Sequence, residues 1–312
     1  MKIIPQSVEL FKHDIGEYKF IEKCARVCYK SEDKITEDSA AKMVGALKKN
    51  GHRAMFEHEF LYFKLEEGRW HEFWSMFGKY ATYLHFASNK YITGSIRAWM
   101  ELFITLDSIH AVDIDSTMMW LAHNKLPLLF DEPMHEEKVY GIELMTREQF
   151  VEDAMKTDPD ILKYALPHTF KFITNRGVGN ELTRHRANIV FAQESSRYVD
   201  YSADGSEHQI TVIHPLIHET DLANYNSWHY ACLMAETQYM NLRKGGIAAE
   251  NARGVLPLDC KTEIVATATE EEWQHIINLR CHGTTGRPHP QMKELMDMTL
   301  PILTEESNGR IK

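Results

Sequence analysis

The chain has 312 residues, of which 44% are hydrophobic and 26% are charged. This composition is ordinary for a globular protein, and a chain of this length buries a sizeable core without disulfides or a structural metal. Lysine and arginine number 35 against 45 aspartates and glutamates, so the formal net charge is −10. Because so acidic a protein repels a phosphate backbone, we expect no nucleic-acid partner, and any anionic ligand needs a local group of arginines.

The cysteines and the hydropathy indicate the compartment. The five cysteines are odd in number and mostly far apart in the sequence, which argues against a disulfide framework and favours a reducing cytosol. The first residues, MKIIPQSVELFKHD, lack the apolar core of a signal peptide. No uninterrupted apolar run reaches the roughly 18 residues of a membrane span. We therefore expect a cytoplasmic protein with no membrane segment.

The first half of the chain predicts two clear elements and one ambiguous region. Residues 36–49 carry acids in the first turn and lysines in the last, as expected of a helix. Residues 56–66 alternate apolar and polar side chains, which predicts a strand. Residues 67–104 are aromatic and helix-like, whereas residues 105–160 show weak periodicity and many charges. The stretch 105–160 is therefore the best candidate for an insertion or subdomain.

The second half alternates strands with helices. Three glutamates at 270–272 suit the positive end of a helix dipole, and Gly245 and Gly246 are typical of a helix stop. The predicted elements are a strand at 168–175, a helix at 178–189, a helix at 222–245, a strand at 261–268, a helix at 270–280 and a helix at 290–303, broken at Pro301.

The densest chemical signal is Arg184-His185-Arg186, followed by the run QESSRY at 193–198. Two arginines that flank a histidine repel one another unless an anion or acid lies nearby. Guanidinium groups are also well suited to bidentate recognition of phosphate. The pattern predicts an anion site, and the alternative is a solvated basic turn that pairs with surface acids.

Two further segments carry isolated candidates. His52 lies where a helix stop runs into a strand, at the edge of an element where ligands often bind. Arg253 and Arg280 each lie near a predicted helix end. The alternative for both arginines is a helix-end cation that interacts with the dipole of its own helix.

Metal and nucleotide motifs are weak or absent. His214 and His218 are spaced i, i+4, but Pro215 lies between them, so a loop is favoured over a metal site and we expect no metal. The sequence contains neither GxGxxG nor GxxxxGK[ST], so neither a dinucleotide fingerprint nor a P-loop supports phosphate binding.

Taken in chain order, these segments resemble the flavin-dependent thymidylate synthase family. The matching blocks are GHRAMFEH at 51–58, ELTRHRANIVFAQESSRY at 181–198, ARGVLPLDCKTEIVATA at 252–268, INLR at 277–280 and HPQ at 289–291. The resemblance implies a mixed α/β (α+β) fold, with a small, mainly antiparallel sheet and surrounding helices in a single domain over 1–312. It also implies that the region at about 67–165 is an insertion. It implies a homotetramer whose active sites form where subunits meet.

The resemblance also implies the reaction and its cofactor. The expected reaction converts dUMP to dTMP, with methylenetetrahydrofolate as carbon donor, NADPH as reductant and FAD as the bound redox carrier. An enzyme of this family is an FAD-dependent methyltransferase, and it lacks the cysteine nucleophile of the classical thymidylate synthase. None of the five cysteines need therefore be catalytic.

Carried onto this sequence residue by residue, the resemblance assigns the site. The expected flavin contacts are His52, Arg184, His185, Arg186, Gln193, Thr269, Glu271 and His275. The expected dUMP contacts are Glu181, Arg184, Gln193, Ser195, Arg197, Arg253 and Arg280. Arg253 is expected to reach a neighbouring subunit's site. Arg280 is the expected catalytic residue, because a cation on the N3/O2 edge of uracil stabilises negative charge there and makes C5 more nucleophilic.

The sequence departs from the family pattern at three places. Eight residues separate Arg186 from Ser195, one more than usual, which predicts a reshaped loop. Thr269 and Glu271 stand where members often have Asn and Arg, and an acid is unfavourable beside a flavin phosphate. Arg280 and the HPQ block are also further apart than in compact members. We expect a local rearrangement at the flavin edge, with activity retained.

Two other functions stay open at this point. The first is a nucleotide- or RNA-binding regulator that uses the arginines without redox chemistry. The second is a metal-dependent hydrolase built on His214, His218 and a carboxylate.

Overall fold

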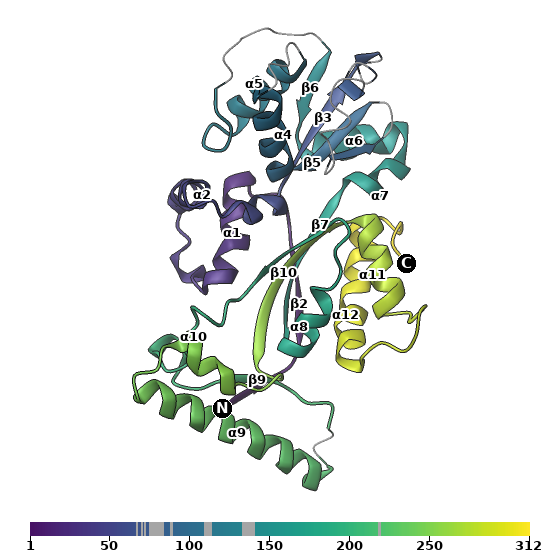
Figure 1. The fold of residues 1–312 in the computed structure, drawn as a ribbon. Helices are drawn as coiled ribbons and strands as arrows, with labels where there is room; N and C mark the ends of the chain where they lie inside the picture. Colours follow the sequence, from purple (N-terminus) through teal and green to yellow (C-terminus); the bar gives the residue numbers. More distant parts are fainter. Residues whose placement is uncertain are drawn as a thin grey trace.

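The computed structural model describes residues 1–66, 68–69, 71, 73–74, 84–87, 90–108, 114–132, 141–217 and 220–312. The molecule is elongated, with a sheet in its middle, a second sheet at one end and a long helix across the other end (Figure 1). The α-helices are α1 (Glu17–Tyr29), α2 (Ser39–Lys49), α4 (Ile96–Ser108), α5 (Ile114–Lys125), α6 (Arg147–Thr157), α7 (Leu162–Ala165), α8 (Arg176–Leu182), α9 (Leu222–Lys244), α10 (Ala249–Ala252), α11 (Glu270–Arg280) and α12 (Pro290–Glu306). The strands are β1 (Lys2–Ile4), β2 (Ser7–Phe11), β3 (Phe60–Leu65), β4 (Leu84–Ala87), β5 (Tyr91–Ser95), β6 (Ile142–Met145), β7 (Pro167–Asn175), β8 (Ile189–Gln193), β9 (Thr211–Ile213) and β10 (Lys261–Thr269). Short 3-10 helices are η1 (Glu32–Lys34), η2 (Arg53–His58), η4 (Pro159–Ile161), η5 (Asp204–Ser206) and η6 (Arg253–Val255).

The central sheet has the strand order β2-β7-β10-β8, and every neighbouring pair is antiparallel. Side chains alternate between its two faces because a strand has a period of two. Phe170, Phe172 and Ile264 lie on one face and pack with Trp273 under α8, α11 and α12. Val265 lies on the other face with residues of α1. The sheet therefore carries a helical layer on each side.

The second sheet has the order β4-β5-β3-β6 and is also antiparallel. It shares a hydrophobic cluster with α1, α2, α4 and α5. A short parallel pair, β1 with β9, lies beside α9 (Figure 1). The mixed α/β class with mainly antiparallel sheets is therefore confirmed, and no described helix is both long and apolar enough to cross a membrane.

Four predicted elements differ from the structure. The strand predicted at 56–66 begins only at Phe60, because the residues before it form η2. The helix-like reading of 67–104 is wrong at β4 and β5, whose backbones pair with one another and with β3. The parts of 67–104 that fall in the gaps of the described ranges lie outside the described residues.

The helix predicted at 178–189 ends at Leu182, and Ile189 begins β8. Strand β8 begins with the β-branched residues Ile189 and Val190 and pairs with β10, which is distant in the sequence. Such pairing overrides a local helical pattern. Helix α12 continues through Pro301, because buried contacts on both sides of the proline, at Thr299 and Leu303, hold the helix together. The remaining predicted strands and helices at 36–49, 168–175, 222–245, 261–268 and 270–280 are confirmed within a few residues.

Candidate functional site

The Arg184-His185-Arg186 turn is positioned by the junction between β7 and α8. The last strand residue, Asn175, caps α8 by accepting a hydrogen bond from the backbone N–H of Val178 at 2.8 Å. Its side-chain nitrogen donates to Asp259 at 3.0 Å and to Gln291 at 2.9 Å. One buried amide therefore ties the start of α8 to the segment just before β10 and to α12, and the turn follows the other end of α8.

The end of α11 meets this turn. Arg280 lies in the last turn of α11, and its Nε donates to Nε2 of His185 at 3.2 Å. A terminal nitrogen of Arg280 also lies 3.7 Å from the Glu181 carboxylate. Glu181, His185 and Arg280, which were predicted from two separate sequence blocks, thus lie together near the C-terminal ends of α8 and α11.

The contact with Arg280 defines the state of His185. An arginine nitrogen can only donate, so Nε2 of His185 is the acceptor and its ring proton lies on Nδ1. Burial first, and then the charge of Arg280 and the neighbouring His275, lower the pKa of His185 to about 4. His185 is therefore a neutral imidazole at neutral pH.

Glu272 lies beside this imidazole, with its carboxylate 3.8 Å from Nδ1. Burial, followed by the negative charge of Glu271, raises the pKa of Glu272 to about 7. His185, Glu272 and His275 present donor atoms within 4.8 Å of one another, a spacing compatible with a metal ion. The Nδ1 atom that faces Glu272 carries the proton, however, so this tautomer of His185 offers no lone pair to a cation there.

The flanking arginines are free to bind a ligand. Arg184 and Arg186 are both exposed, and the described part of the chain places no acid within ion-pair distance of either. His275 and Glu271 are exposed on α11, whereas Thr269 is buried at the end of β10 with its hydroxyl unpartnered. The exposed guanidinium groups of Arg184 and Arg186 suit a phosphate-bearing ligand. Glu181, Glu271 and Glu272 bring opposing carboxyl groups to the same region.

A second group of predicted residues lies in the loop that follows β8. Arg253, at the start of η6, donates to Ser196 at 3.1 Å. Arg197 pairs with Glu250 at 3.4 Å, with its side chain largely exposed. The hydroxyl of Ser195 accepts from the backbone N–H of Arg197 at 3.4 Å. The loop after β8 thus carries the guanidinium group of Arg197 and the hydroxyls of Ser195 and Ser196, and the guanidinium group of Arg253 contacts it.

His52 belongs to this second group. Its Nδ1 lies 3.0 Å from the hydroxyl of Tyr29, and the Tyr29 ring lies 6.0 Å from the ring of Tyr198. Gln193, at the end of β8, donates to Thr262 of β10 at 3.1 Å. Tyr29 was missed by sequence reasoning, because its helix lies outside the recognised blocks.

All of the predicted site residues except Thr269 and Glu271 therefore form two groups in one chain. The turn group comprises Glu181, Arg184, His185, Arg186, His275 and Arg280, and the loop group comprises His52, Gln193, Ser195, Arg197 and Arg253. Glu272, like Tyr29, was missed, and its only sequence signal was its place in the acidic first turn of α11. Of the two histidines weighed for a hydrolase, His214 contacts the carbonyl of Pro215 at 3.1 Å, and His218 lies outside the described residues.

Comparison with known proteins gives a consistent set of relatives. The sequence model of the thymidylate synthase complementing protein family matches residues 131–307. A probable flavin-dependent thymidylate synthase of Paramecium bursaria Chlorella virus 1 is 29% identical over 154 residues, which cover 43% of this chain and 71% of the relative. The flavin-dependent thymidylate synthase of Geobacter sulfurreducens is 33% identical over 109 residues, which cover 34% of this chain and 44% of the relative. That of Pyrococcus abyssi is 33% identical over 144 residues, which cover 43% of this chain and 57% of the relative.

Among solved structures, a UMP/dUMP methylase from Streptomyces cacaoi bound with 5-Br dUMP matches with a TM-score of 0.43 and 16% identity, over 98% of this chain and 93% of that one. The sequence matches span about half the length of the Geobacter and Pyrococcus relatives. The family match itself covers more than half of this chain, so the family predicted from the motifs is confirmed.

Proposed function

The chain belongs to the thymidylate synthase complementing protein family, and we propose on that premise that it is a flavin-dependent thymidylate synthase. In this proposal it is an FAD-dependent methyltransferase that converts dUMP to dTMP. Methylenetetrahydrofolate supplies the carbon and NADPH the reducing equivalents. The names of its relatives support the flavin and the activity.

The observation that carries the proposal is the contact of Arg280 with His185 and Glu181. A pyrimidine that acquires negative charge on its N3/O2 edge needs a cation already in place, because reorganising one during the reaction costs free energy. Arg280 donates a hydrogen bond to His185, lies within ion-pair distance of Glu181 and keeps a quarter of its side chain exposed. It is thus oriented in advance and still accessible to a base, and we assign it as the activating residue.

The turn group fits the flavin. Two exposed guanidinium groups that have no acid partner among the described residues suit the negative charge of a dinucleotide phosphate. The neutral His185 between them adds no further positive charge. When bound, FAD supplies the redox chemistry, and the protein positions it against the pyrimidine. Arg184, His185, Arg186 and His275 hold it in this proposal, with Thr269 and Glu271 at its edge.

The loop group fits the nucleotide phosphate. Ser195 and Arg197 together with Arg253 supply hydroxyl and guanidinium donors, which bind phosphate strongly through charge-assisted hydrogen bonds. Arg253 serves the site of a neighbouring subunit in this proposal. Gln193 lies between the loop and the sheet and contacts both ligands.

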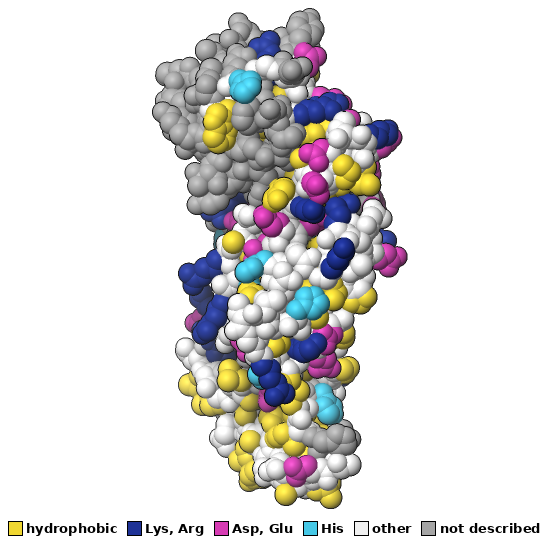
Figure 2. Space-filling model, turned by 90° about the vertical axis from the view of Figure 1, so that its right-hand side faces the viewer, with side chains coloured by type: hydrophobic (Ala, Val, Ile, Leu, Met, Phe, Trp, Pro, Cys, Tyr) yellow, Lys and Arg dark blue, Asp and Glu magenta, His cyan; other side chains and the backbone are white. Residues whose placement is uncertain are grey.

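We propose a homotetramer whose active sites lie where subunits meet. Hydrophobic side chains gather over the lower end of the molecule in Figure 2, the end that carries α9 in Figure 1. The exposed apolar residues on α9 include Leu222, Tyr230, Leu233 and Met234. Exposed apolar side chains that gather on one end are typical of a protein–protein contact, and a second copy of this chain would cover them in this proposal.

The proposal treats residues 1–312 as one domain with an insertion at about 67–165. The second sheet and its helices occupy most of that range. We place the enzyme in the cytoplasm, because all five of its cysteines are free thiols, as expected of a reducing compartment.

A visible spectrum of the purified protein, followed by tritium release from labelled dUMP with the folate and NADPH present, tests the function. We expect flavin absorbance, and we expect tritium to be released from labelled dUMP when the folate and NADPH are present. A colourless protein that does not take up added FAD would refute the proposal. Tight oligonucleotide binding that weakens steeply with salt would instead support the alternative, a non-redox nucleotide- or RNA-binding regulator.

A further inference from the structure

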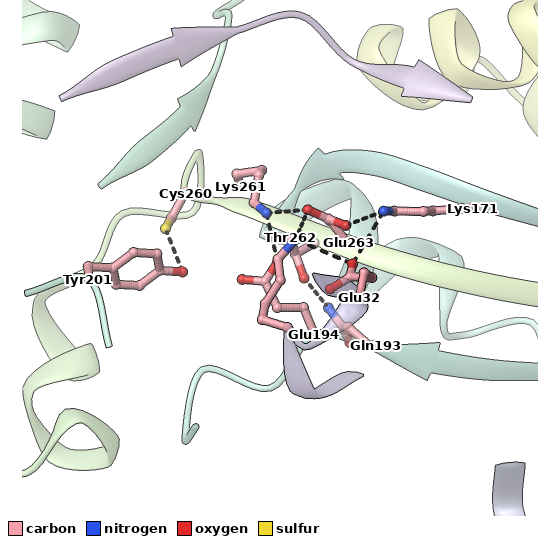
Figure 3. Close-up of polar contacts among 10 residues, drawn as sticks. Glu32, Lys171, Gln193, Glu194, Tyr201, Cys260, Lys261, Thr262 and Glu263 are labelled. Atoms are coloured by element: carbon pink, nitrogen blue, oxygen red, sulfur yellow. Dashed lines mark hydrogen bonds and ion pairs between the residues drawn. The ribbon is translucent and has the colours of Figure 1, made fainter. Parts of the chain in front are cut away.

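A network of alternating charges lies next to the loop group, where β8 ends against β10 (Figure 3). Three lysines face three glutamates across the sheet and the end of α1, and the cluster is neutral as a whole. Its members are Lys30, Lys171, Lys261, Glu32, Glu194 and Glu263. Neither the catalytic role of Arg280 nor the phosphate contacts of the loop make use of this network.

Glu194 is the most buried member, with none of its side chain exposed. The Nζ of Lys261 lies 2.8 Å from its carboxylate, whereas that of Lys30 lies 3.9 Å away. A carboxylate this deeply buried requires a cation, because removing one partner of a buried pair leaves an uncompensated charge. Lys261 is therefore the nearest cation to Glu194, and the charges of Lys30 and Arg176 add attraction from further away.

Glu194 lies between two residues of the loop group, Gln193 and Ser195. The backbone N–H of Glu194 donates to the carbonyl of Glu263 at 2.8 Å, and that of Ser195 donates to Cys28 at 3.3 Å. The only charged anchor within these three residues is the Glu194 carboxylate. The cation that holds this carboxylate therefore acts together with the two backbone hydrogen bonds to position Ser195 and the loop that follows it.

We propose that Lys261 is a positioning residue for the substrate, which acts through Glu194 to hold the loop at 193–198 in the conformation that binds the phosphate of dUMP. This inference rests on the proposed function, since it takes the loop to be the nucleotide site. Without Lys261, the Glu194 carboxylate moves toward water and draws the loop away from the sheet.

The network contains a matched control. Lys171 is as buried as Lys261, with 16% and 13% of their side chains exposed, and pairs with Glu263 at 2.7 Å. It lies on β7 and no ion pair joins it to Glu194 within the described residues. Loss of Lys171 therefore removes a buried lysine from the same network without touching the anchor of the loop.

The test measures the KM and kcat of the FAD-loaded enzyme for dUMP, with the Kd of dUMP from calorimetry. Lys261→Met is expected to raise KM and Kd by about ten-fold or more and to change kcat by less than about two-fold. Lys261→Arg is expected to keep wild-type values, because it keeps the charge. The double variant Lys261→Met with Glu194→Gln is expected to recover most of the loss, because the carboxylate that needed the cation is gone.

Three results would overturn the inference. The first is an unchanged KM in Lys261→Met, or an equal rise in Lys171→Met. The second is a double variant no better than Lys261→Met alone. The third is a Lys261→Met protein without flavin absorbance. That result would mean that the Lys261–Glu194 pair stabilises the fold as a whole and does not act on the loop alone. A wild-type protein without dUMP-dependent turnover would instead defeat the proposed function, so the two failures are distinguishable.

Discussion

Replacing Glu272 by glutamine should stabilise the protein in a pH-dependent manner. Only 8% of the Glu272 side chain is exposed, and burial, together with Glu271, raises its pKa from 4.5 to about 7. One pKa unit corresponds to about 1.36 kcal/mol. Ionising Glu272 therefore costs the folded state about 3 kcal/mol more than the unfolded state, and glutamine removes that cost.

The sign follows from proton linkage. Between pH 4.5 and about 7 the unfolded chain loses the Glu272 proton while the folded chain keeps it, so stability falls as the pH rises. His185 acts in the opposite direction, because its pKa is lowered to about 4 and protonation below its unfolded pKa of about 6.5 favours unfolding. The pH dependences of stability that Glu272 and His185 cause partly cancel in the wild-type protein. Only the difference in unfolding free energy between wild type and variant therefore isolates the effect of Glu272.

Urea denaturation of both proteins at pH 5 and pH 8, at one fixed FAD concentration, measures this difference. Ligand concentration is held constant because bound ligand adds to the apparent stability. We expect the variant to gain less than about 1 kcal/mol at pH 5 and about 3 kcal/mol at pH 8. An equal gain at both pH values would refute the reasoning, because it would mean that Glu272 ionises normally in the folded protein.

Two further predictions concern α11. Arg280→Ala is expected to lower kcat by at least about 100-fold, the typical effect of losing a preplaced transition-state donor, while flavin absorbance stays at the wild-type level. Lys293→Met, which removes only a surface pair with Asp297, is the control, and wild-type turnover in Arg280→Ala would remove the assigned role. Trp273→Ala is expected to cost about 3–5 kcal/mol of unfolding free energy. The Trp273 side chain is fully buried, and its indole N–H donates to the carbonyl of His168 at 2.9 Å. Urea denaturation measures this loss, and a change below about 1 kcal/mol would show that the core repacks around the cavity.

The sequence predicted those helices and strands that are determined by residues within the element itself. The strand at 261–268 and the helix at 270–280 follow from apolar pattern and helix-end charges, and both are present as β10 and α11. The strand β8 was missed because its short β-branched segment is fixed as a strand by pairing with β10, some 70 residues later in the chain. Residues 84–95 were mistaken for helix for the same reason, since β4 and β5 depend on β3.

The site shows the same division. The motif blocks singled out Arg280, His185 and Glu181, and the structure brings these three together. Nothing in the spacing of Lys261 and Glu194 indicates that their side chains meet, because the contact depends on the register of two strands and on the burial of a charge. Sequence patterns thus identify groups that act on ligands more readily than the groups that hold them in place.

The amide of Asn175 has a consequence for how the site comes into being during synthesis. It joins the beginning of α8 to Asp259 and to Gln291 of α12, and Gln291 follows Asn175 by 116 residues. The arginine-rich turn leaves the ribosome more than 100 residues before Gln291, so one of the partners that orient its helix is made well after the turn itself. A nascent chain that still lacks Gln291 would thus display its guanidinium groups before the contacts that orient α8 are complete.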